Sequence, residues 1–279
     1  MHHVYLRFPG GKDKCLTLSY DDCVEQDIRL CELMKQYGIA GTFNINTGSF
    51  VEEGHVFEPG RVHRRMSKKQ TTELFAGEPL FEVATHSATH PFLNRIPVAH
   101  ATREVLTDRI NIEEQFGVIC RGHAYPYGTY NDQVLECLRA CGIVYARTVQ
   151  STEKFTFPED FLLWHPTCHH DDPRLMELTE TFLAEGKRPV PKLFYLWGHS
   201  FEFEEKDNWH VIEEFFKRIA GREDVWYATN IQVYDYKQAF DQLVWNVDCS
   251  KVYNPTATDL WFHAKKQVHC VKAGETLSL

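Results

Sequence analysis

Strand-like and helix-like segments alternate along most of this chain. The first strand-like segment, "CLTLSY" at residues 15–20, alternates apolar and polar side chains, and the next segment places apolar side chains at helical spacing as far as Gly38. Six more strand-like segments follow, at residues 41–46, 80–85, 119–125, 143–149, 192–198 and 225–230. Because each helix carries the chain back to the end where the previous strand began, this alternation predicts a parallel sheet.

The later helix-like segments cover residues 102–117, 131–142, 172–186, 208–221 and 233–243. About seven strand–helix units predict an α/β fold whose parallel sheet closes into a (β/α) barrel, and 279 residues are enough to form it as one domain. We expect this domain to span residues 1–243. Residues 244–279 have short β-like segments and turns, so we expect a β-rich C-terminal extension packed on the barrel.

Charge and cysteine usage limit the partners of the protein. A formal charge of −9 disfavours nucleic acid and anionic membranes as main partners. No apolar run approaches the roughly 18 residues of a membrane span, and the first residues lack the apolar core of a secretory leader. The nine cysteines are odd in number and scattered, which is typical of reduced thiols. We therefore expect a cytoplasmic protein.

Polar side chains follow or end five of the predicted strands. In such barrels the chemistry gathers at the carboxyl ends of the strands. The groups expected at this rim are Asp21 and Asp22 after the first strand, Thr85–His90 after the third, "YPYG" (125–128) after the fourth, Arg147 late in the fifth and "GHS" (198–200) after the sixth.

The spacing of His86 and His90 predicts a metal site. Two imidazoles four residues apart point the same way on a helical turn, and two such nitrogens with a carboxylate make a zinc site with an open position for water. Spacing alone also fits surface or capped histidines, and His165 and His169 repeat it with Pro166 between them. The adjacent aspartates favour a metal, because a divalent cation would relieve their repulsion and leave one carboxylate free as a base.

Four segments resemble the successive motifs of the polysaccharide deacetylases, the NodB-homology or fourth carbohydrate esterase family. These are "LTLSYDD", "THSATHPFL", "YPYG" and "LWGHS", and the resemblance extends over roughly residues 14–240. It implies a distorted barrel of seven or eight strands. It also implies a metal-dependent hydrolase that removes acetyl groups from an N-acetylated poly- or oligosaccharide. The implied metal is Zn²⁺, with Co²⁺ or another divalent ion as an alternative.

The resemblance also implies roles for individual residues. Asp22, His86 and His90 would hold the metal, and Asp21 would be the general base that takes a proton from water. His199 matches the histidine that protonates the departing amine. Without the other motifs, His199 would equally fit a histidine capped by backbone at a strand end.

Three further residues take supporting roles by the same resemblance. The backbone N–H of Tyr127 would stabilise the oxyanion, and Pro126 would form a rigid turn beside the substrate, although an ordinary loop turn would also use it. Ser87 is expected to steady the histidine loop by hydrogen bonding.

Two parts of the family pattern are missing. The arginine that pairs with the base aspartate is replaced by Ala124, and Arg147 is a candidate to reach the same carboxylate. A surface arginine in an ion pair is the alternative. The aspartate that orients the proton-donating histidine is also missing. Asp171 or Asp172 could replace it, although Asp172 also fits a helix cap before Pro173.

Aromatic side chains suggest where a sugar would bind. Trp197, Trp164 and His169 are predicted to contact the substrate, because sugar rings stack on such faces, while core packing remains the alternative for each. Two other functions stay open. One is a hydrolase of a non-sugar amide or a cyclic ureide or imide, and the other is a non-catalytic carbohydrate-binding relative.

Overall fold

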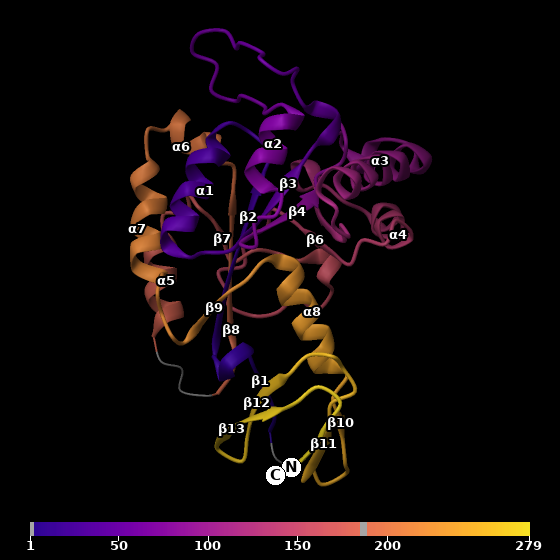
Figure 1. Cartoon of the computed structure of the whole chain (residues 1–279), viewed down its shortest axis with the longest axis vertical. Helices are drawn as coiled ribbons and strands as arrows, with labels where there is room; N and C mark the ends of the chain where they lie inside the picture. The colour runs from indigo at the N-terminus through magenta and orange to yellow at the C-terminus, as the bar shows by residue number, and fades with distance from the viewer. Residues whose placement is uncertain (1–2, 185–188) are drawn as a thin grey trace.

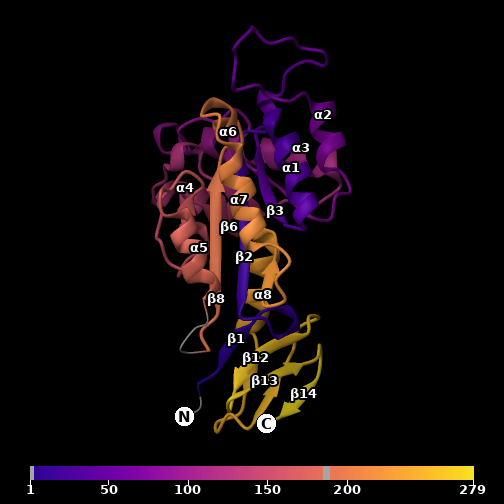
Figure 2. The same cartoon turned by 90° about the vertical axis from the view of Figure 1, so that its left-hand side faces the viewer.

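A computed structural model describes residues 3–184 and 189–279 (Figures 1 and 2). Its main sheet has eight strands, all parallel, in the order β6-β5-β4-β3-β2-β8-β7, with β9 pairing beside the start of β2. The predicted α/β barrel with about seven parallel strands is confirmed. The strands are β2 (Lys14–Asp21), β3 (Gly41–Ile45), β4 (Phe81–Thr85), β5 (Gly122–Ala124), β6 (Tyr145–Arg147), β7 (Cys168–His169), β8 (Lys192–Gly198) and β9 (Val225–Tyr227).

An irregular segment that leads into β7 joins the two ends of the sheet. On one side, Trp164 N donates to Ala146 O in β6 (3.0 Å), and Thr148 N donates to Trp164 O (3.1 Å). On the other side, Thr167 N donates to Tyr195 O in β8 (2.8 Å). Backbone hydrogen bonds therefore close the sheet into a barrel, and the irregular geometry of this segment distorts it.

Eight α-helices are present among the described residues. They are α1 (Gln26–Tyr37), α2 (Lys68–Phe75), α3 (Val98–Phe116), α4 (Asp132–Ala140), α5 (Leu175–Leu183), α6 (Phe201–Glu205), α7 (Trp209–Ile219) and α8 (Asn230–Asp241). Short 3₁₀ turns lie at η1 (Pro9–Gly11), η2 (Thr47–Ser49), η3 (Leu93–Arg95), η4 (Pro126–Gly128) and η5 (Phe161–Leu163). Six helices match predicted segments, whereas α2 and α6 were missed. Residues 185 and 186 of one predicted helix, and residues 1 and 2 of the predicted barrel domain, lie outside the described residues.

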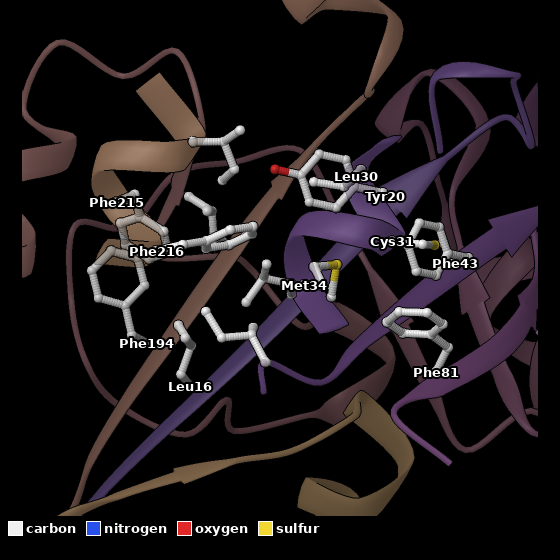
Figure 3. Packing of buried hydrophobic residues seen from close by; sticks show 14 of the residues in the cluster. Leu16, Tyr20, Leu30, Cys31, Met34, Phe43, Phe81, Phe194, Phe215 and Phe216 are labelled. Atoms are coloured by element: carbon white, nitrogen blue, oxygen red, sulfur yellow. The ribbon is translucent and has the colours of Figure 1, made fainter. Parts of the chain in front are cut away.

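Apolar side chains fill the space between the sheet and the helices α1 and α7 (Figure 3). Leu16 in β2 and Phe194 in β8 pack with Met34 in α1 and with Phe215 and Phe216 in α7, and all five are fully buried. Burying a side chain of this size contributes about 1.5–3 kcal/mol of transfer free energy. This core fixes β2 and β8, whose carboxyl ends carry candidate catalytic residues.

The alternation of side chains along β2 explains why an aspartate ends it. Leu16, Leu18 and Tyr20 belong to the core under the helices. The residues between them face the other side of the sheet, because successive strand side chains point to opposite faces. Thr17 and Ser19 on that side hydrogen-bond to other buried polar groups. Asp21 continues this polar row to the mouth of the barrel.

Two small antiparallel sheets lie at the end of the barrel opposite the candidate site (Figures 1 and 2). One contains β10 (Val244–Trp245), β11 (Lys251–Tyr253) and β14 (Thr276–Ser278). The other pairs β12 (Leu260–Ala264) with β13 (Gln267–Val271) and with β1 (Tyr5–Arg7), which comes from the start of the chain. The domain boundary at residues 243 and 244 stays a prediction. Among the described residues, no helix is both long enough and apolar enough to cross a membrane.

Candidate active site

The carboxyl ends of the barrel strands bring together most of the polar residues that the sequence singled out. Asp21 ends β2, the loop of His86 and His90 follows β4, Arg147 ends β6 and His199 follows β8. The long loop between η2 and α2 projects beyond this same end of the barrel (Figures 1 and 2). The site is therefore built from side chains that are distant in sequence.

Asp21 lies buried in a positively charged environment. The guanidinium of Arg147 donates from Nη2 to Asp21 Oδ2, and Asn44 Nδ2 donates to Asp21 Oδ1 (2.8 Å). Histidine nitrogens also face the carboxylate, with His86 Nε2 at 3.7 Å and His199 Nε2 at 3.8 Å from Oδ2. Burial alone would raise the pKa of Asp21, but Arg147 and the two histidines outweigh it and lower the pKa below its usual value. Asp21 is therefore ionised at neutral pH.

Asp22 turns away from its neighbour. Its φ of 84°, followed by 56° at Cys23, bends the chain through left-handed conformations directly after β2. The Asp22 carboxylate meets Arg65 Nη2 at 3.0 Å and His63 Nε2 at 3.2 Å, both from the projecting loop. Burial would raise its pKa, but these two partners hold it far below the usual range. The repulsion between the adjacent aspartates is thus relieved by Arg147 on one side and by Arg65 on the other, even without a cation.

The rings of His86 and His90 meet edge to face, with centroids 4.6 Å apart. His86 Nδ1 donates to Ala124 O (2.7 Å), which leaves a lone pair on Nε2. That nitrogen lies 3.1 Å from His90 Nε2, which in turn lies 3.9 Å from Asp22 Oδ1. Burial lowers the pKa of both rings, that of His90 to about 4, so both are neutral near pH 7. The segment is a loop with positive φ at Ser87 and His90, not the helical turn assumed from the spacing.

These three side chains fit a divalent cation. One ligand-type atom from each of Asp22, His86 and His90 lies within 4.8 Å of the other two. Two neutral imidazole nitrogens and one carboxylate form a ligand set suited to zinc. The two Nε2 atoms lie 3.1 Å apart, so a cation beside both could take a lone pair from each.

Asp108 on α3 anchors the histidine loop. This buried carboxylate accepts hydrogen bonds from Thr47 N (2.7 Å), Thr47 Oγ1 (2.7 Å), Thr85 Oγ1 (2.5 Å) and His86 N (3.1 Å). By contrast, Ser87 Oγ is buried without a hydrogen-bond partner among the described residues. The expectation that the Ser87 side chain steadies the loop is therefore corrected, because Asp108 provides the anchoring contacts. Nothing in the sequence distinguished Asp108 from other helix-borne acids.

His199 is held by a carboxylate that the sequence analysis did not identify. Its Nδ1 lies 3.2 Å from Glu202 Oε1, three residues further along and on α6. Burial would lower the pKa of His199, but Glu202, Asp21 and Asp22 outweigh it and raise the pKa. The i, i+3 spacing of this pair, across the turn that leads from β8 into α6, was the available signal.

Comparisons with known proteins identify the family of the chain. A family model described as polysaccharide deacetylase matches residues 9–146. The chain belongs to the polysaccharide deacetylase family. No curated protein matches its sequence.

Two solved structures with TM-scores of 0.50 or more share the fold of this chain. A Mycobacterium smegmatis protein assigned to the polysaccharide deacetylases superposes with a TM-score of 0.57 at 16% identity, over 86% of this chain and 96% of that one. The family 4 carbohydrate esterase from Streptomyces lividans, in complex with acetate, gives 0.50 at 14% identity, over 77% and 91%. The Streptococcus pyogenes deacetylase PplD, in complex with acetate, gives 0.46 at 20% identity over 53% of this chain, and only 61% of PplD is covered.

In this member of the polysaccharide deacetylase family, the arginine that faces Asp21 comes from the strand next to β5. Ala124 in β5 pairs in register with Arg147 in β6. Arg147 is fully buried, and its guanidinium lies 4.3 Å from the ring centre of Trp197. The alternative of a surface arginine is therefore excluded. The register of β5 and β6 places Arg147 beside Ala124. A guanidinium therefore still reaches Asp21, although the position of the family's arginine holds alanine.

The "PYG" segment forms the tight turn η4 beside His86 and His90. Pro126 is buried, whereas Tyr127 is 53% exposed with a φ of 57°. The Tyr127 ring stacks on Phe92 with centroids 3.8 Å apart, and lies 4.5 Å from the His90 ring. A Cβ on Gly128 would lie 2.3 Å from Val149 Cγ2, so only glycine fits there. The role of the Tyr127 N–H stays a prediction.

The three predicted substrate contacts lie in different environments. Trp164 is 1% exposed and packs against the Tyr145 and Tyr195 rings, which favours a core role and corrects its placement in the cleft. Trp197 is 8% exposed, and its Nε1 has no hydrogen-bond partner among the described residues. His169 Nε2 lies 3.1 Å from Glu202 Oε2. Trp197 therefore stays the best candidate of the three.

Neither aspartate proposed as the partner of His199 fills that position. Asp171 pairs with Lys206, and Asp172 Oδ1 accepts from Arg174 N (2.8 Å) in the turn before α5. Glu202 is the carboxylate that contacts His199, which corrects the expectation.

Proposed function

We propose that this protein is a metal-dependent hydrolase that removes acetyl groups from an N-acetylated sugar, with Zn²⁺ as the ion and Co²⁺ as an alternative. The observation that supports this most is the arrangement around Asp21. One carboxylate kept ionised by Arg147 lies between the Asp22, His86 and His90 cluster and His199. A base, a ligand set for a cation and a proton donor are therefore within reach of one substrate carbon.

The reaction divides naturally among these groups. A divalent ion held by Asp22, His86 and His90 would supply Lewis acidity toward water and toward the acetamide carbonyl. Asp21 accepts a proton from the attacking water while the oxygen bonds to the carbonyl carbon. The Tyr127 N–H is proposed to stabilise the oxyanion. His199 then donates its proton to the sugar nitrogen as the C–N bond breaks, so that acetate and a free amine are formed.

The surroundings of Asp21 and His199 support the acid–base assignment of each. Arg147 lowers the pKa of Asp21 and fixes the orientation of its carboxylate, so Asp21 is ready to accept a proton. Burial would lower the pKa of His199, but Glu202 and Asp21 outweigh it and raise the pKa, which favours the protonated ring that a proton donor needs. The two residues thus begin the cycle in opposite protonation states, as a base and an acid must.

Several observations support the choice of substrate and compartment. The stacked Tyr127 and Phe92 rings next to His90 offer an aromatic surface suited to a sugar ring. The Streptomyces lividans esterase of the same fold was solved with acetate, the product expected here. The cysteines are all free, which supports a reducing compartment such as the cytoplasm. The non-catalytic alternative rested on a lost arginine, and the contact of Arg147 with Asp21 argues against it.

Acetate release from a panel of substrates tests the proposal. The full chain would be loaded with Zn²⁺ or Co²⁺ and incubated with N-acetylglucosamine oligomers, peptidoglycan fragments, simple N-alkyl acetamides and cyclic imides. We expect acetate only from the acetylated sugars and only with metal. Hydrolysis of the imides alone would favour the non-sugar amidase instead. Metal binding with no hydrolysis of any substrate would favour a non-catalytic carbohydrate-binding protein.

A further inference from the structure

A second group of metal-ligand side chains lies next to His199. Suitable atoms of His169, His170, Asp171 and Glu202 lie within 4.8 Å of one another. The first three follow one another at the end of β7, and Glu202 comes from α6. None of these residues belongs to the Asp22, His86 and His90 cluster.

His170 is the feature that points to a ligand. The side chain is completely buried, yet neither ring nitrogen has a hydrogen-bond partner among the described residues. Its Nε2 lies 3.0 Å from Glu202 Oε2, but this contact lacks hydrogen-bond geometry and Oε2 is likewise without a partner. Buried polar atoms nearly always have a partner. An ion that binds both atoms from one side would satisfy them at this separation.

Packing fixes the orientation of the His170 ring. It stacks on Phe203 with centroids 4.1 Å apart and on Tyr20 at 5.8 Å. A Cβ at Gly198 would come 2.0 Å from His170 Nδ1, so the glycine makes room for the ring. The imidazole is therefore held in one orientation, with Nε2 toward the two carboxylates.

The polar groups around His170 differ in how they could interact with an ion. Asp171 Oδ2 lies 3.7 Å from His170 Nε2. His169 Nδ1 accepts the Asp171 N–H (3.2 Å), and its Nε2 lies 3.1 Å from Glu202 Oε2 without forming a hydrogen bond to it. His169 thus lies beside Glu202 with its Nδ1 already taken by a backbone N–H. Lys206 Nζ contacts Asp171 and competes with a cation, but Lys206 is 46% exposed and free to move into solvent.

We propose that His170, Asp171 and Glu202 form a second binding site for a divalent transition-metal ion. One imidazole nitrogen and two carboxylate oxygens suit Zn²⁺ or Co²⁺, with water completing the coordination. A cavity of about 280 Å³, lined by His170, Asp171, Asn208 and His210 among others, reaches the same cluster and gives the ion a route.

The site would act on catalysis through Glu202, a consequence that rests on the proposed function. Glu202 Oε1 contacts His199 Nδ1 at 3.2 Å, while Oε2 belongs to the second site. An ion on Oε2 takes negative charge away from the proposed proton donor. Occupancy of the second site is therefore expected to slow turnover.

Calorimetric titration of the chelator-treated full chain with Co²⁺ or Zn²⁺ tests the site without substrate. We expect two equivalents in the wild type, one in the His86→Ala/His90→Ala double variant, and one in Asp171→Asn, which changes a half-buried side chain without changing its size. Lys206→Met should tighten the second equivalent several-fold, because it removes the competing charge. His210→Ala, at an exposed residue of the same cavity, should keep both equivalents.

A single equivalent in the wild type would overturn the proposal, as would a second equivalent that survives both Asp171→Asn and Glu202→Gln. If deacetylation occurs, a second equivalent should slow it in the wild type but not in Asp171→Asn. Failure to find any acetate release would contradict the proposed function and leave the stoichiometry as the test of this site.

Discussion

Arg147 Nη2 contacts Asp21 Oδ2 at the carboxyl ends of the barrel strands, although 126 residues separate the two in sequence. Both side chains are almost fully buried. Each of the two buried charges needs the other, because a buried charge without a partner lowers the stability of the folded protein.

Replacing Arg147 should therefore affect both activity and stability. We predict that Arg147→Ala lowers turnover by about 100-fold, because Asp21 loses its orientation. It should also lower the free energy of unfolding by about 3–5 kcal/mol, since Asp21 is left buried and unpaired. Steady-state kinetics and denaturant unfolding measure the two effects.

Two control variants separate these effects. Arg139→Ala breaks an exposed pair with Asp160 and should cost less than about 1 kcal/mol. Adding Asp21→Asn to Arg147→Ala should recover stability but not turnover. If Arg147→Ala retained full turnover, the proposed function of the pair would be wrong.

Glu202 should set the alkaline limit of activity. The pKa of His199 is raised, and its acid form is present below that pKa and lost as the pH rises through it. Removing the Glu202 charge lowers the pKa of His199. In Glu202→Gln the loss of turnover should therefore begin at a lower pH than in the wild type. At alkaline pH the rate should fall by about tenfold or more. Glu205→Gln, an exposed change on the same helix, is the control. An unchanged alkaline limit in Glu202→Gln would exclude His199 as the proton donor controlled by this carboxylate.

Gly128 should be irreplaceable in the "PYG" turn. Its φ is 66°, and an added Cβ would lie 2.3 Å from Val149 Cγ2. We therefore predict that Gly128→Ala lowers the free energy of unfolding by about 2–4 kcal/mol and also lowers turnover. Gly117 has the same φ with nothing within 4 Å, so Gly117→Ala should cost only about 1 kcal/mol. Equal losses in the two variants would show that crowding at the turn has no effect. Thermal and chemical unfolding provide the comparison.

Substitution of Asp108 should lower stability and metal affinity, whereas substitution of Ser87 should change little. Asp108→Asn places an amide donor among the four groups that donate hydrogen bonds to this side chain. We predict that it lowers the free energy of unfolding by about 2–4 kcal/mol. It should also weaken metal affinity by about 10- to 100-fold. Ser87→Ala removes an oxygen without a partner among the described residues and should change stability by less than about 0.5 kcal/mol. Unfolding and metal titration would be measured on both. A Ser87→Ala protein with weaker metal binding than Asp108→Asn would reverse our assignment of the anchor.

The sequence predicted the parts of the molecule that have a local pattern. Seven parallel strands and six helices followed from the period of apolar residues. The missed strand β7 has only two residues, Cys168 and His169, too few for a period to show. The pairing of β1 with β12 joins opposite ends of the chain, and no local pattern encodes such a contact.

The same distinction applies to the candidate site. Asp21, His86, His90 and His199 follow strands, so their meeting at one rim could be expected. Arg65 reaches Asp22 only because the long loop between η2 and α2 folds back over the barrel. Side chains supplied by such loops depend on tertiary packing and left no signal in the sequence.

The dependence of acetate release on metal occupancy tests the central claim most directly. Chelator-treated protein would be given increasing Zn²⁺, and acetate from an N-acetylglucosamine oligomer would be measured against bound metal. We predict no release without metal, recovery as the first equivalent binds, and no recovery in the His86→Ala/His90→Ala double variant at any occupancy. Undiminished release from the metal-free protein, or from the double variant, would contradict a metal-dependent mechanism at this site.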